Sequence, residues 1–75
     1  MRRDVTDVVD RLWRARRRHD RLDAVLGRRG GSWVLQFLHN DRPFLSRRYR
    51  RRDLASAEAE ARLRDLQRAG WNTHW

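Results

Sequence analysis

The stretch from 32 to 52 constrains the fold of this chain more than any other segment. An apolar run from Trp33 to Leu38 meets the turn-forming residues Asn40 to Arg42, and a second run from Phe44 then passes into arginines. Runs that alternate apolar and polar residues on both sides of turn chemistry are typical of two antiparallel strands. We therefore predict a β-hairpin over about 32–51.

The register of this hairpin depends on the length of its turn. A three-residue turn pairs Phe37 with Leu45 and Trp33 with Tyr49 on one face, whereas a turn of two or four residues moves the second strand's side chains to the other face. We prefer the three-residue turn because it gathers the large side chains, although the sequence leaves the register open. Pro43 has no N–H to donate, which suits the start of an edge strand.

The segment from Asp4 to Leu26 is predicted to be one long helix. Asp4 or Thr6 can cap its start, and Gly27 can take the left-handed conformation that ends it. Charged residues four positions apart, such as Asp10 and Arg14, support its solvent face.

The apolar positions of this predicted helix are spaced alternately by three and four residues, which is the pattern of a heptad seam. The seam consists of Val5, Val8, Leu12, Ala15, His19, Leu22 and Leu26. It either packs on the hairpin of its own chain or pairs with the same helix in a second copy. The residues predicted to lie at such an interface are Val5, Val8, Leu12, His19 and Trp13.

A second helix is predicted over about 54–69, because a lone hairpin is barely stable in water and needs a cover. Its apolar stripe consists of Ala55, Ala59, Leu63, Leu66 and Ala69. Gly70 fits the left-handed position after the helix, so that Trp71 contacts Leu66 in a Schellman motif, and a short tail over 70–75 follows. The predicted fold is thus α+β, a single domain over 1–75 in the order α-β-β-α, with two helices covering the hairpin.

The chain is short and strongly basic. Its 75 residues bury only ~60–65% of the surface that the unfolded chain exposes, and no cysteine is present to stabilise it through a disulfide. We therefore expect it to pair with a copy of itself or with a partner. The net charge is +9, and all 19 basic residues are arginine, so that nucleic acid, acidic proteins and anionic lipid are the attracted classes. A genome rich in arginine codons explains the missing lysine as readily as function does.

The sequence contains no constellation that indicates catalysis or metal binding. His19, His39 and His74 lie far apart without a metal-ligand motif, and no Ser/His/Asp set is recognisable. We predict a protein that is not an enzyme and that needs no metal or cofactor. No run approaches the ~18 apolar residues of a membrane-spanning helix, and the first residues lack the apolar core of a signal peptide. The expected location is the cytoplasm, without a membrane partner.

Nucleic acid, either DNA or RNA, is the predicted partner. The main predicted contacts are Arg47, Arg48, Arg50, Arg51 and Arg52, with Tyr49 among them to stack on a base. A second row shares one face of the first predicted helix and consists of Arg14, Arg17, Arg18 and Arg21. These residues would bind backbone phosphates with little base specificity, because no recognition-helix motif is visible. The alternative is a protein-interaction module that forms a homodimer or binds an acidic partner.

The segment from Trp33 to Trp71, a basic hairpin followed by a helix, resembles the small ββα DNA-binding modules such as the arm-type domains of phage integrases. The resemblance lies in the order and pattern of the elements. It implies that a basic sheet lies in a groove of DNA and that a helix supports the sheet from behind. Those modules usually have three strands, whereas this segment predicts two.

Overall fold

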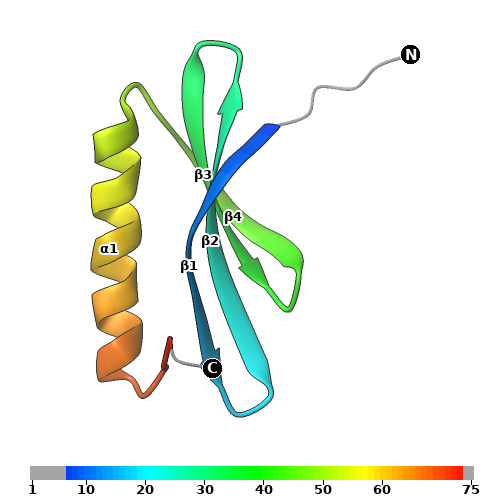
Figure 1. Ribbon diagram of the computed structural model, residues 1–75, viewed down its shortest axis with the longest axis vertical. Coiled ribbons are helices and arrows are strands. Elements are labelled where there is room, and N and C mark those ends of the chain that lie inside the picture. Colours follow the sequence, from blue (N-terminus) through cyan, green and yellow to red (C-terminus); the bar gives the residue numbers. More distant parts are fainter. Residues whose placement is uncertain (1–6, 74–75) are drawn as a thin grey trace.

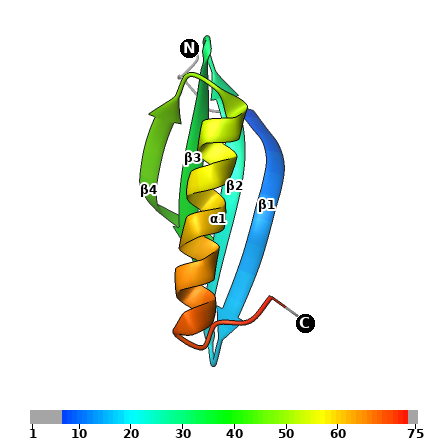
Figure 2. The same cartoon turned by 90° about the vertical axis from the view of Figure 1, so that its left-hand side faces the viewer.

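The protein is a four-stranded antiparallel sheet with one helix on one of its faces (Figure 1). The computed structural model describes residues 7–73. The elements are β1 (Asp7–Arg17), β2 (Asp20–Arg29), β3 (Ser32–His39), β4 (Arg42–Tyr49) and α1 (Arg52–Arg68). The strands follow one another across the sheet in chain order, and α1 lies over the central strands β2 and β3 (Figure 2). The fold is α+β, in the order β-β-β-β-α.

The predicted order α-β-β-α is wrong, because the described part of the segment predicted as the first helix forms the hairpin β1–β2. Bulges at Val9 and Leu12 interrupt the alternation of β1. The apolar residues of the strand are therefore spaced by three and four positions, as they are in a heptad. The β1–β2 turn, Arg18-His19, has none of the glycine or asparagine that usually marks a tight hairpin, yet Arg18 adopts a left-handed φ of 56°. The predicted cap at Asp4 or Thr6 lies outside the described residues.

The hairpin predicted over about 32–51 is confirmed as β3–β4, but its turn is shorter than predicted. Asn40 and Asp41 form a two-residue turn with φ values of 49° and 73°, the positive values that a type I′ turn requires. The preferred pairs Phe37–Leu45 and Trp33–Tyr49 nevertheless form. A bulge in β4 at Phe44 adds the residue that the short turn lacks, so the large side chains still meet on one face.

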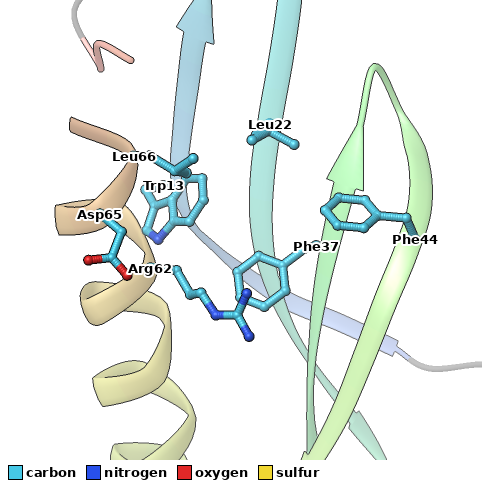
Figure 3. Close-up of a pocket in the computed structure, with 7 residues that line it drawn as sticks. All are labelled: Trp13, Leu22, Phe37, Phe44, Arg62, Asp65 and Leu66. Carbon is cyan, nitrogen blue, oxygen red and sulfur yellow. The ribbon is translucent and has the colours of Figure 1, made fainter. Parts of the chain in front are cut away.

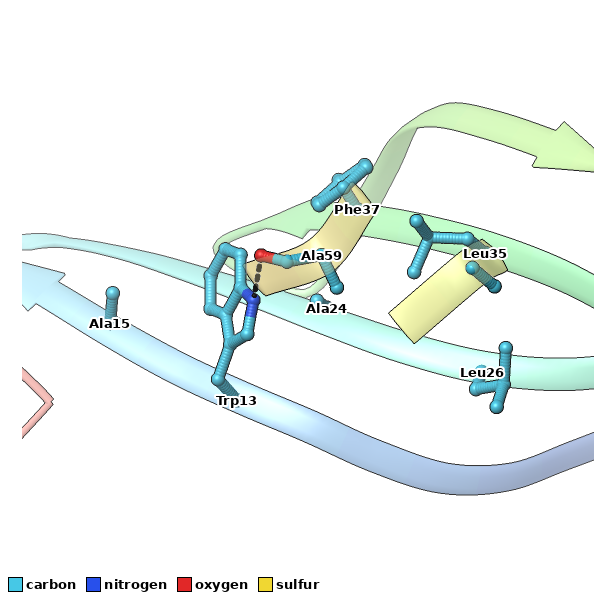
Figure 4. Packing of buried hydrophobic residues seen from close by; sticks show 8 residues of the cluster. Trp13, Ala15, Ala24, Leu26, Leu35, Phe37 and Ala59 are labelled. Carbon is cyan, nitrogen blue, oxygen red and sulfur yellow. Dashed lines mark hydrogen bonds between the residues drawn. The ribbon is translucent and has the colours of Figure 1, made fainter. Parts of the chain in front are cut away.

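The core lies between α1 and the face of the sheet that the helix covers. Its buried cluster consists of Trp13, Ala15, Ala24, Leu26, Leu35, Phe37, Ala55 and Ala59. Figure 3 shows Trp13 and Phe37, and Figure 4 shows the packing of the cluster. Two of the five residues in the predicted helical stripe, Ala55 and Ala59, are fully buried, and their small side chains let α1 approach the sheet closely. Trp13 Nε1 donates a hydrogen bond of 2.8 Å to the carbonyl oxygen of Ala59, which ties β1 to the middle of α1.

The predicted Schellman motif at the end of α1 is confirmed. The N–H of Trp71 donates to Leu66 O at 2.9 Å, and the N–H of Gly70 donates to Gln67 O at 3.1 Å. Gly70 has a φ of 97°, and Leu66 and Trp71 both pack against the core. The chain then returns to the sheet, where the backbone of Asn72 pairs with that of Arg16 on β1. The motif therefore directs the C-terminal segment onto the edge of the sheet.

Substituting Gly70 with alanine should lower the free energy of unfolding by about 1–2 kcal/mol, because a side chain disfavours the left-handed backbone. Gly31→Ala is the matched control: Gly31 has no left-handed φ, and an added Cβ there meets open space. Urea unfolding should show a lower midpoint for the first variant and an unchanged or slightly higher one for the second. Equal midpoints for both variants would contradict the assigned role of Gly70.

Candidate nucleic-acid interface

The sheet face opposite α1 is basic. Residues that alternate with the core residues along each strand lie on this face, which we call the open face. Its arginines, the open-face arginines, are Arg11, Arg14, Arg16, Arg21, Arg29 and Arg48. Two carboxylates, Asp23 and Asp41, pair with them. By contrast, α1 carries equal numbers of opposite charges: Arg52, Arg62, Arg64 and Arg68 against Asp53, Glu58, Glu60 and Asp65.

The carboxylates Asp23 and Asp41 pair with two of the open-face arginines. The side chain of Asp23 is 7% exposed, and its two oxygens accept hydrogen bonds from Nε and Nη2 of Arg14 at 2.9 and 3.0 Å. Arg21 Nε lies 4.0 Å from the same carboxylate, and its Nη2 forms an ion pair with Asp41. Because a buried carboxylate must be paired, this network holds both guanidinium groups in place beside one another.

Two other open-face arginines are available to a ligand. Arg11 on β1 and Arg48 on β4 are exposed, and neither forms an ion pair with any residue in the described part of the chain. Between them, the uncharged side chains of Val25, Gln36 and Ser46 cross the sheet in one register row beginning at Arg11. Gln36 Nε2 donates to Ser46 Oγ at 3.2 Å. The open face therefore has exposed cations on both outer strands and an uncharged stretch in the middle of the central strands, with Arg21, Asp23 and Arg29 nearer the ends of β2.

The structure divides the arginines predicted over 47–52 among different surroundings. Arg48 lies on the open face, whereas Arg47 and Tyr49 lie on the helix side of β4, where Tyr49 packs against the core. Arg50 is exposed just beyond β4. Arg51 donates to Asp53, and Arg52 donates to Asp10 at 3.1 Å. Arg52 also lies over the Trp33 ring, 5.5 Å from its centroid. These arginines therefore do not form one surface.

The predicted row of four arginines on a helix face is wrong, because the segment is not helical. Arg14 and Arg21 do lie close together, on the open face. Arg17 lies on the helix side, where it donates to Ala69 O at 3.0 Å and lies over the Trp71 ring, and Arg18 lies in the β1–β2 turn. The prediction missed Arg11 and Arg16; strand alternation read through the β1 bulges is the signal that identifies them.

The predicted interface residues do not form a seam. Trp13 is in the core of its own chain, and Leu12 packs against that core. Val8 is 62% exposed, and His19 is exposed in the β1–β2 turn. Val5 lies outside the described residues. The basis for a helical dimer interface is therefore absent from the described part of the chain.

A small cavity of about 190 Å³ lies on the helix side of the sheet (Figure 3). Its lining consists of Trp13, Leu22, Phe37, Phe44, Arg62, Asp65 and Leu66. The guanidinium of Arg62 lies 5.5 Å from the centroid of the Phe37 ring and donates to Glu58 at 2.8 Å. The lining is mainly apolar, and it offers no arrangement of acid and base groups around a reacting atom. The cavity is separated from the open-face arginines by the sheet.

Residues 7–73 contain no group of histidine, cysteine or acidic side chains that could hold a metal ion. Within the same residues, no helix is long and apolar enough to cross a membrane. No family model, curated protein or solved structure matches the chain. The open face is therefore the feature from which a function can be inferred.

Three exposed carboxylates make the stability of the protein sensitive to acid. Hydrogen bonds from His39, Arg21 and Arg51 lower the pKa values of Asp20, Asp41 and Asp53 respectively. A pKa that is lower in the folded state stabilises the fold above the ordinary value of about 4, and this contribution is lost as the pH falls through the folded pKa.

The thermal midpoint should therefore change little through these groups between about pH 7 and 5, and fall below about pH 4. In the double variant Asp41→Asn and Asp53→Asn, the fall between about pH 5 and 3 should be smaller than in the unaltered protein. Melting curves followed by circular dichroism measure both. An equal fall in the two proteins would contradict the assigned contributions.

Proposed function

We propose that this protein binds nucleic acid through backbone phosphates, with the open face of the sheet as its contact surface. The observation that carries the proposal is the composition of the open face: six arginines and two paired carboxylates lie on it, while the charges of α1 itself cancel. Guanidinium groups bind phosphate through planar, bidentate hydrogen bonds, and each neutralised phosphate releases condensed counterions. A concentrated basic face gains from both effects.

The arrangement of individual side chains supports the proposal. Asp23 orders Arg14 through two hydrogen bonds and Asp41 forms an ion pair with Arg21, so less side-chain entropy is lost when these arginines contact a phosphate. Arg11 and Arg48 are exposed on opposite outer strands without an ion pair to a described residue. The open face thus combines two ordered cations with two cations that are available for contact.

The sheet also has a helix behind its basic face, which is the arrangement implied by the resemblance of the β3–β4–α1 segment to ββα DNA-binding modules. Little base specificity is expected, because arginines outnumber the uncharged polar side chains on the open face. A cytoplasmic location forms part of the proposal. The predicted protein-interaction module had its main support in the heptad seam, which is not formed.

A binding titration tests the proposal. A fluorescently labelled random duplex of about 20 base pairs is titrated with the protein at about 50 and 200 mM salt, and anisotropy is recorded. If about four phosphates are neutralised, the affinity should fall about 10²-fold between the two salt concentrations. Absence of binding at the lower salt concentration would overturn the proposed function.

A further inference from the structure

The aromatic residues of the described chain all lie on the helix side of the sheet. Trp13 and Phe37 belong to the buried cluster, while Trp33, Tyr49 and Trp71 pack against it. Phe44 lines the cavity between the sheet and α1 (Figure 3). Within residues 7–73, the open face therefore presents no ring on which an unpaired base can stack.

This placement bears on the kind of nucleic acid that the open face fits. Sheets that bind single strands present aromatic side chains on which successive bases stack, and each such contact contributes ~1–3 kcal/mol. The open face would contact a single strand through its arginines alone. Splayed bases would then meet Val25, Gln36 and Leu38, which offer little stacking surface.

The arrangement of cations suits two phosphate rows instead of one. Arg11, Arg14 and Arg16 lie on β1 and Arg48 lies on β4. Four of the six open-face arginines therefore belong to the outer strands, which are three strand spacings apart, about 14 Å. Between them, Val25, Val34 and Gln36 form an uncharged stretch in the middle of β2 and β3, while Arg21 and Arg29 lie nearer the ends of β2. The major groove of B-form DNA is about 12 Å wide, admits two β-strands and has a phosphate backbone along each side.

We infer that the ligand of the open face is double-helical DNA. In this complex β2 and β3 face the major groove, and the arginines of β1 and β4 contact the two flanking phosphate backbones. This inference rests on the proposed function and narrows it from nucleic acid to the B-form duplex. An A-form RNA duplex does not fit in the same way, because its major groove is too deep and narrow for side chains to read. Gln36 on β3 then faces the edges of the base pairs, where its amide group forms hydrogen bonds.

Direct titrations of labelled duplex DNA, single-stranded DNA and duplex RNA, matched in length and sequence, test the inference at one low salt concentration. Duplex DNA should bind about tenfold or more tightly than either alternative, since a single strand has lower charge density and nothing to stack on. Single-stranded DNA or duplex RNA binding as tightly as duplex DNA would overturn the inference and leave the proposed function standing. If none of the three binds, the proposed function itself fails.

Discussion

Replacing Trp13 with alanine should remove a large fraction of the free energy of unfolding. Trp13 is 8% exposed, contacts the aromatic ring of Phe37 and donates its Nε1 hydrogen to Ala59 O. Truncating a buried tryptophan costs about 3–5 kcal/mol. The whole stability of a 75-residue chain, at roughly 0.05–0.15 kcal/mol per residue, is about 4–11 kcal/mol. The loss is therefore a large fraction of what holds the fold together.

Two further variants show which feature of Trp13 accounts for the loss of stability. Trp13→Phe keeps most of the buried area but leaves Ala59 O without its indole donor, which should cost about 1–2 kcal/mol. Val8→Ala alters the same strand at a residue that is 62% exposed, and it should cost less than about 0.5 kcal/mol. Urea unfolding measures all three. If Val8→Ala destabilised the protein as much as Trp13→Ala, the strand assignment would be contradicted, because the helical interpretation placed Val8 on the seam and Trp13 off it.

Removing two open-face arginines should weaken DNA binding more than removing two arginines elsewhere. In the double variant Arg11→Gln and Arg48→Gln, we expect the affinity for duplex DNA to fall by more than about tenfold. The slope of log K against log salt should become shallower by roughly 1.8, because each lost phosphate contact removes ~0.9. Titrations at several salt concentrations supply both numbers. Both residues are exposed and form no ion pair within the described chain, so the fold should be unaffected.

The matched control is Arg47→Gln with Arg64→Gln. It removes the same charge from two exposed residues on the other side of the sheet, one on β4 beside Arg48 and the other on α1. We expect a loss of affinity below about threefold, through the change in net charge alone. Equal losses in the two double variants would show that binding follows net charge without regard to the face, and would contradict the assignment of the open face.

The second half of the fold could be predicted from sequence because its signals are local. The turn at Asn40-Asp41, the apolar stripe of α1 and the Gly70-Trp71 ending all lie within a few residues of what they specify. The first half could not be predicted in the same way, because bulges interrupt the period of β1 and the Arg18-His19 turn contains no glycine or asparagine. Asp10 and Arg14, which the sequence suggested as a helical pair, instead pair with Arg52 and Asp23, 42 and 9 residues away.

The candidate site could likewise be predicted only in part from the sequence. The sequence revealed an excess of arginine but not the surface that carries it, because the face of a strand residue depends on register. Arg47 and Arg48 are neighbours in the chain and lie on opposite faces of the sheet. The bulge at Phe44 determines which of the two lies on the open face. Arg11 reaches the open face only through the β1–β2 pairing.

The central claim, that the open face binds nucleic acid, is tested most directly by methyl chemical-shift mapping with duplex DNA. The methyl groups of Val25 and Leu38 lie on the open face, whereas those of Leu26 and Leu35 are fully buried beneath α1. Adding DNA should shift the signals of Val25 and Leu38 strongly and leave those of Leu26 and Leu35 nearly unchanged. Shifts confined to residues on the helix side, with Val25 and Leu38 unaffected, would contradict the claim.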